Sequence, residues 1–256
     1  MRILSIALAA AAVIGLSSSV ALAAGGPNAA QKPSGIEWTH SGPFGTFDRA
    51  AAQRGLVVYK EVCAGCHSLK YVAFRNLTGI GLNADEIKAL AKEYDIADLD
   101  EDGEETDRPG KPSDYFPSPF ANAKAAAAAN GGALPPDLSL MIKARANGDN
   151  YVHALLTGYG DAPADFDVME GLSYNPYFEG RQLAMTAPLS EDAVEFADGT
   201  PATVDQMAKD VVVFLAWAAE PTMEARKNLG VKVMIFLLIF TGLMYAVKRR
   251  VWADLH

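Results

Sequence analysis

The stretch EVCAGCHSLK, residues 61–70, contains the only two cysteines of the 256-residue chain, Cys63 and Cys66, and His67 follows them directly. The spacing Cys-x-x-Cys-His is typical of sites where haem c is covalently attached. Two intervening residues let both sulfurs reach the two vinyl groups on one edge of a porphyrin from a single tight turn. The histidine is then held beneath the ring, where its imidazole can bind iron. The motif therefore predicts one covalently bound haem c.

Two other uses of a Cys-x-x-Cys pair fit this sequence less well. A thioredoxin-like redox pair would need a βαβ context, and the sequence contains no convincing run of alternating strands. A zinc site would need a second pair of ligands, and the chain has no further cysteine. A visible absorption spectrum would distinguish a haem protein from a thiol oxidoreductase.

The first 23 residues have the pattern of an export signal. They place one early positive charge, Arg2, before the apolar run ILSIALAAAAVIGL, and they close with the small-residue triplet Ala-Leu-Ala at 21–23. This order is typical of a secretory signal peptide. Export would bring the cysteines into an oxidising compartment, where free thiols normally pair, and haem attachment accounts for both of them.

The other end of the chain has the pattern of a membrane anchor. Residues 229–247 contain a single charge, and as a helix they would span about 28 Å, close to the hydrocarbon thickness of a bilayer. Three basic residues follow at 248–250, and clustered positive charge marks the cytoplasmic flank of a spanning helix. The pattern predicts an exported domain at 24–228, one transmembrane helix at 229–247 in membrane lipid, and a cytoplasmic tail at 248–256.

The exported part of the chain is strongly acidic. The whole chain carries a formal net charge of −9; the signal contributes +1 and the tail +2, so the part between them carries −12. We expect such a domain to bind no nucleic acid and to attract a basic partner. Seven of its acids lie within residues 98–107, which we interpret as a solvated loop.

The globular part is predicted to be mainly α-helical with long loops. Apolar residues recur at steps of three or four over 47–62 and over 204–219, which indicates two amphipathic helices, and we expect these to pack together. Shorter helices are expected at 84–94, 121–129, 138–145 and 150–157. Four prolines at 108–119, and a Gly-, Pro- and Asp-rich composition at 158–190, predict irregular structure.

Three other histidines are candidates for the sixth position of a haem iron. His256 lies beyond the predicted anchor, on the opposite side of the membrane. His153 lies inside the apolar run YVHALL, so we expect it to be a packed or surface residue. His40 precedes the first predicted helix in a loop, where a ligand role stays open.

The methionines of the exported part are Met141, Met169, Met185, Met207 and Met223. Met207 lies on the apolar face of its predicted helix, so we expect it to pack. Met223 lies in the linker to the anchor, and Met141 lies within a helical segment behind the Pro-Pro turn. Met169 and Met185 lie in the irregular region, where a loop can present sulfur to a buried metal. Met185 is better placed, because GRQLAMTAPL puts it just after a glycine turn and just before a proline. A His/Met pair raises the haem potential, which suits electron transfer to a high-potential acceptor.

Several segments together resemble the cytochrome c1 family. The resemblance is carried by CAGCH behind an amphipathic helix, ANGGALPPDLSLMIKAR, DNYVHALLTGY, RQLAMTAPL and an anchor ending in KRR, and it covers the chain from about residue 44 to the end. It implies a cytochrome c-like haem domain on one transmembrane helix. The site residues it implies are the thioether-forming Cys63 and Cys66, the axial ligands His67 and Met185, Arg145 beside a haem propionate, and Tyr151 nearby.

The chain departs from some bacterial relatives in one respect. These relatives hold the loop before the methionine with a second cysteine pair, which this chain lacks. We therefore expect packing or hydrogen bonds, with the aromatic-rich segment SYNPYF as a candidate source, to fix Met185.

The resemblance also implies a function. It implies a subunit of a quinol–cytochrome c oxidoreductase in a bacterial inner membrane, with the haem domain in the periplasm and with cytochrome b and Rieske iron–sulfur subunits as partners. Electrons would pass from the Rieske protein to a basic cytochrome c, and the chain would supply a tuned haem with no bond-making chemistry of its own. One alternative is an anchored monohaem carrier for a different reductase or oxidase, and another is a haem sensor with a labile sixth ligand.

Overall fold

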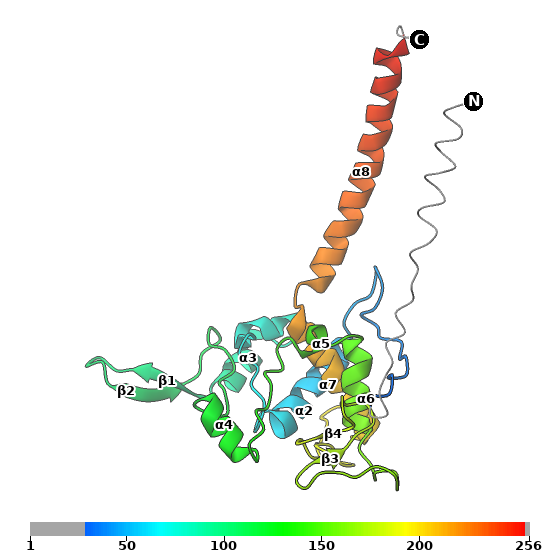
Figure 1. Ribbon diagram of the computed structural model, residues 1–256. Coiled ribbons are helices and arrows are strands. Elements are labelled where there is room, and N and C mark those ends of the chain that lie inside the picture. The colour runs from blue at the N-terminus through cyan, green and yellow to red at the C-terminus, as the bar shows by residue number, and fades with distance from the viewer. Residues whose placement is uncertain (1–28, 254–256) are drawn as a thin grey trace.

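The computed structural model describes residues 29–253, so the signal predicted at 1–23 lies outside the described residues. Figure 1 shows a helical body from which one long helix, α8, departs. The helices of the body are α2 (Arg49–Val58), η1 (Tyr59–Cys63), η2 (Phe74–Ile80), α3 (Ala84–Ala91), α4 (Ala123–Ala129), α5 (Met141–Ala144), α6 (Gly148–Thr157) and α7 (Val204–Ala219). Two small antiparallel sheets pair β1 (Asp95–Leu99) with β2 (Glu105–Pro109) and β3 (Ser173–Tyr174) with β4 (Gln182–Leu183). The mainly helical fold class predicted from the sequence is confirmed.

The core lies where α2 packs against α7. The two backbones approach closely at Gly55, where an added Cβ would lie only 2.1 Å from the carbonyl oxygen of Asp210. Both helices start at side-chain caps, because Asp48 and Thr203 accept hydrogen bonds from N–H groups in the first turns. The predicted packing of 47–62 against 204–219 is thus present, and it supports the turn that follows α2.

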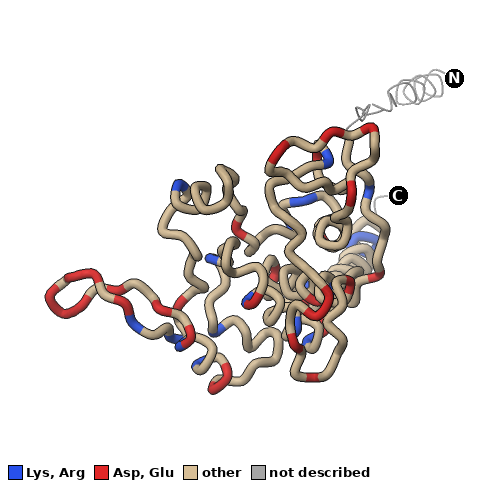
Figure 2. Tube along the Cα trace, turned by 90° about the horizontal axis from the view of Figure 1, so that it is seen from below, with Lys and Arg blue, Asp and Glu red and all other residues tan. Residues whose placement is uncertain are grey.

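The acidic run at 98–107 is a hairpin and not the loop that its composition predicted. β1 and β2 pair in register from Asp95 with Pro109 to Leu99 with Glu105, so only the residues between the strands form the turn. Arg108, directly after the run, explains the difference, because its guanidinium bonds both Asp98 and Asp114 and offsets part of the charge. Figure 2 shows the hairpin projecting from the body with acidic residues around its tip.

Helix α8 (Met223–Val251) contains the predicted anchor but is longer than it. Its 29 residues rise about 43 Å at 1.5 Å per residue, more than the hydrocarbon core of a bilayer needs. The large apolar side chains from Leu229 onward are exposed, and the most apolar 18-residue window has a mean hydropathy of 2.1. By length and composition, α8 can therefore cross a membrane.

The first turns of α8 belong to the body, so Met223 does not lie in a free linker as the sequence indicated. Met223 is buried, and the carboxylate of Glu224 forms two hydrogen bonds with Arg49, at 2.9 and 2.7 Å. One turn later, Lys227 donates to the carbonyl oxygen of His40 at 2.7 Å. These contacts, which we call the α8 clasp, fix the direction in which the helix leaves the body.

Candidate functional site

The two thiols lie on one tight turn at the end of the first core helix. The chain passes from α2 through η1, which ends at Cys63, and the N–H groups of Cys66 and His67 both donate to the Cys63 carbonyl, at 3.1 and 2.9 Å. Cys63 is half-buried, Cys66 is exposed, and neither forms a disulfide. Burial raises the pKa of the Cys63 thiol to about 12, whereas a reactive redox thiol needs a lowered pKa.

The imidazole of His67 is oriented by the segment LPPD, residues 134–137, which we call the proline turn. Its Nδ1 lies 2.8 Å from the carbonyl oxygen of Pro136. A carbonyl can only accept, so Nδ1 carries the proton and Nε2 keeps a lone pair for a metal. Burial lowers the pKa of His67, which favours the neutral imidazole that binds metals. Tyr59 adds a hydrogen bond from its hydroxyl to the His67 carbonyl, at 3.2 Å.

Asp137 joins the proline turn to the residues that follow the histidine. One of its oxygens accepts from the Ser68 hydroxyl at 2.7 Å and from the Lys70 N–H at 3.0 Å, and the other accepts from the Ser139 N–H at 3.0 Å. Burial alone would raise the pKa of Asp137, but these hydrogen bonds lower it. The ionised carboxylate therefore holds Pro136 in place against the imidazole.

The two methionines that the sequence left as main candidates have different surroundings. Met169 is 64% exposed, and its N–H donates to the side chain of Gln182. Met185 is half-buried, and its carbonyl oxygen accepts a hydrogen bond from the hydroxyl of Tyr159 at 3.1 Å. A half-buried thioether on a tethered loop is the better donor to a buried metal, so Met185 stays the predicted ligand.

The histidines His40 and His153 are both engaged elsewhere. Nε2 of the buried His40 lies 3.0 Å from a carboxylate oxygen of Asp149, and Nε2 of His153 lies 2.9 Å from one of Asp205. Each ring thus joins two parts of the body through a carboxylate. Met207 is fully buried within α7, which fits the packing role expected for it.

Arg145 and Tyr151 lie on either side of the start of α6. Arg145 is exposed, its guanidinium donates to the carbonyl of Ala144 at 3.1 Å, and none of the described carboxylates pairs with it. Tyr151 packs against the core from the first turns of α6. Burial, and then the neighbouring hydroxyl of Tyr151, raise the pKa of Tyr159. Tyr151 is therefore close to the tyrosine that holds Met185.

The donor set fits a haem c. One turn offers two thiols and an imidazole whose Nε2 is free, and a separate loop offers a half-buried thioether. Within residues 29–253, no three His, Cys, Asp or Glu side chains gather as a metal-binding group. A porphyrin brings four nitrogen ligands of its own, so it needs only the two axial donors that these segments can supply.

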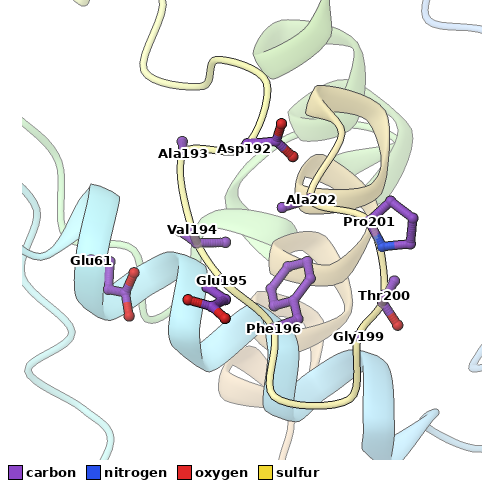
Figure 3. A pocket seen from close by; sticks show the side chains of 10 residues that line it. All are labelled: Glu61, Asp192, Ala193, Val194, Glu195, Phe196, Gly199, Thr200, Pro201 and Ala202. Atoms are coloured by element: carbon purple, nitrogen blue, oxygen red, sulfur yellow. The ribbon is translucent and has the colours of Figure 1, made fainter.

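An open cleft of about 520 Å³ is lined by Glu61 and by residues of the loop 192–202. Figure 3 shows the loop 192–202 passing over the helix that carries Glu61. Acidic side chains, those of Glu61, Asp192 and Glu195, line it beside Phe196. None of the predicted haem ligands lines this cleft, so we do not assign it to the site.

Sequence reasoning missed two residues that support the site. Asp137 is detectable in hindsight, because an aspartate after a proline turn commonly accepts hydrogen bonds from the backbone two residues on. Tyr159 has no such local signal, since its partner Met185 lies 26 residues further along the chain.

Comparison with known proteins gives consistent matches. The profile of the Cytochrome C1 family matches residues 38–255. The chain is 51% identical over 248 residues to the cytochrome b/c1 of Bradyrhizobium diazoefficiens, covering 88% of this chain and 36% of that protein. It is 48% identical over 235 residues to the cytochrome c1 of Rhodospirillum rubrum, covering 85% of this chain and 86% of that protein. It is 51% identical over 220 residues to the mitochondrial cytochrome c1 heme protein of Saccharomyces cerevisiae, covering 85% of this chain and 71% of that protein. The chain thus spans about a third of the Bradyrhizobium protein and most of the other two.

Proposed function

Because the chain belongs to the cytochrome c1 family, we propose that it is the haem-bearing subunit of a cytochrome bc1-type quinol–cytochrome c oxidoreductase. The observation that carries the proposal is the single turn that presents Cys63, Cys66 and a His67 whose Nε2 is left free by the Pro136 hydrogen bond. The names of the relatives, cytochrome c1 and heme protein, support the same cofactor. A bound haem c supplies reversible one-electron chemistry at its iron.

The residues of the site would hold a haem c in different ways. The sulfurs of Cys63 and Cys66 would hold a haem c through thioether links, and Nε2 of His67 would bind its iron. The Pro136 carbonyl fixes the ring orientation and increases the basicity of the imidazole, as outer hydrogen-bond partners of ligating histidines do. The thioether of Met185 would bind the iron as well, and a His/Met ligand pair would raise the potential of the haem. Arg145 would pair with a haem propionate, and Tyr151 would lie nearby.

The membrane arrangement and the partners belong to the same proposal. Helix α8 anchors the chain in a bacterial inner membrane, and the body lies in the periplasm after the signal at 1–23 directs its export. Support comes from the exposed apolar side chains after residue 228 and the basic cluster at 248–250. A Rieske iron–sulfur protein delivers the electron, and a cytochrome c with a basic face accepts it from the acidic body.

Purification in mild detergent tests this assignment. We expect the chain to co-purify with a two-haem cytochrome b and with an iron–sulfur subunit, and the preparation to reduce added cytochrome c with a quinol as donor. Recovery with the subunits of a different reductase or of an oxidase, and without cytochrome b, would support the alternative of an anchored monohaem carrier.

A further inference from the structure

Met185 belongs to the long segment between α6 and α7, and the chain has no cysteine left to cross-link this segment. Both cysteines of the sequence lie in the haem motif. A methionine that serves as a metal ligand has to be held in position by the groups around it. Hydrogen bonds and packed side chains must therefore position Met185.

A small hairpin precedes Met185. Ser173 pairs with Leu183 and Tyr174 pairs with Gln182, and Met185 follows two residues after the second strand. Leu183 is buried, so the hairpin is seated on the body and does not project freely. The hairpin determines where the chain is two residues before the predicted ligand.

Asn175 attaches this hairpin to the C-terminal end of α6. Its side chain is fully buried, its Nδ2 donates to the carbonyl oxygen of Leu155 at 2.7 Å, and its Oδ1 accepts from the N–H of Tyr177 at 3.0 Å. The carbonyl of Leu155 is one of the last four of α6, which lack partners within the helix. Figure 1 shows β3 and β4 directly beyond this end of α6.

Tyr159 attaches the other side of Met185 to the same helix end. It lies two residues after α6, and its hydroxyl donates to the Met185 carbonyl at 3.1 Å. The ring of Tyr177 also packs closely on Gly158, because a Cβ added to Gly158 would lie 2.5 Å from this ring. The end of α6 thus contacts the segment at the turn between β3 and β4 and again at Met185, after the hairpin.

We propose that Tyr159 is a positioning residue for the Met185 ligand, and that Tyr159 and Asn175 together clamp the methionine loop onto the end of α6. The clamp holds the loop without a covalent bond, where a second cysteine pair is lacking. This proposal rests on the assignment of Met185 as the axial ligand. The Tyr159 hydroxyl acts through the Met185 backbone and touches neither the sulfur nor the iron in this role.

The variant Tyr159→Phe tests the clamp because it removes one oxygen atom and keeps the ring. Imidazole, added to the oxidised protein, competes with Met185 for the iron. Losing one neutral hydrogen bond should weaken the hold on the loop and increase the apparent affinity for imidazole about fivefold. The midpoint potential should also fall, and the far-red methionine–iron band should weaken. Tyr174→Phe, in the same hairpin and with its ring packed on Phe166, is the matched control and should behave like the unmodified protein.

The variant Met185→Leu separates failure of the clamp from failure of the ligand assignment. If Met185→Leu changes neither the potential nor imidazole binding, the ligand assignment itself is wrong. If Met185→Leu changes both as predicted, and Tyr159→Phe matches Tyr174→Phe in imidazole affinity and in potential, the clamp proposal is wrong. An increased affinity in Tyr159→Phe alone supports it. Circular dichroism of each variant shows whether the body has kept its fold.

Discussion

Replacing Arg54 by methionine would leave a buried carboxylate without its counter-charge. Asp210 is 1% exposed in the middle of α7, and Nε and Nη2 of Arg54, from α2, donate to its two oxygens at 2.7 and 3.0 Å. After the change, the amide of Gln206 at 3.0 Å would remain as a side-chain donor to this carboxylate. The substitution therefore acts on the α2–α7 contact that supports the cysteine turn.

The structure sets the expected size of the effect. Removing one partner of a buried ion pair costs about 3–5 kcal/mol, because the other charge stays desolvated. Arg54 is 16% exposed and also reaches the exposed Asp198, so some water is close by. We therefore expect the free energy of unfolding to fall by about 3 kcal/mol, the lower end of that range.

Urea unfolding of the full chain in detergent, followed by circular dichroism, measures this change. Lys209→Met is the matched control on α7, because its pair with Asp205 is exposed and should contribute about 0.5 kcal/mol or less. Adding Asp210→Asn to Arg54→Met removes the unpaired charge at nearly constant volume and should recover most of the loss. A loss below about 1 kcal/mol for Arg54→Met would refute the reasoning, as would a double variant no more stable than the single one.

Three further predictions follow from the site, the clasp and the surface charge. Met185→Leu should lower the midpoint potential and let carbon monoxide bind the reduced protein, whereas Met169→Leu should do neither; the reverse result would mean that the other methionine is the ligand. A chain ended after residue 228 keeps the α8 clasp and should melt like the full-length body. One ended after Glu220 loses it and should melt lower; equal melting temperatures would show that the clasp contributes nothing. The rate of electron transfer to a basic cytochrome c should fall as salt rises, because screening shortens to about 8 Å near physiological ionic strength. Neutralising the acids at 98–107 should reduce that dependence only modestly, and its complete loss would make the hairpin the docking site.

The sequence predicted those parts of the structure that depend on local pattern. The apolar periodicity of 47–62 and 204–219 identified the two core helices, because a helix that packs on a core has to show that period. The Cys-x-x-Cys-His motif identified the turn of the site for a similar reason, since its chemistry is contained in five consecutive residues. The prediction of a loop at 98–107 was wrong because it rested on the density of acidic residues alone. The hairpin found there is stabilised by Arg108, which lies just outside the run.

The contacts between distant segments could not be predicted from the sequence. Pro136 meets His67 across 69 residues, and the Lys227 contact with His40 spans 187. No local pattern marks such pairs, because each depends on how whole elements are placed in the fold. The attachment of α8 to the body depends on such placement too, so the sequence alone indicates only a linker at Met223.

The covalent link between haem and protein is the most direct test of the account. The purified chain should be extracted with acid acetone and the pigment then measured as a pyridine haemochrome. We predict that the pigment stays with the polypeptide, at one haem per chain, and that a double variant with Cys63→Ser and Cys66→Ser releases it. Free extraction of the pigment from the unmodified protein would contradict the account.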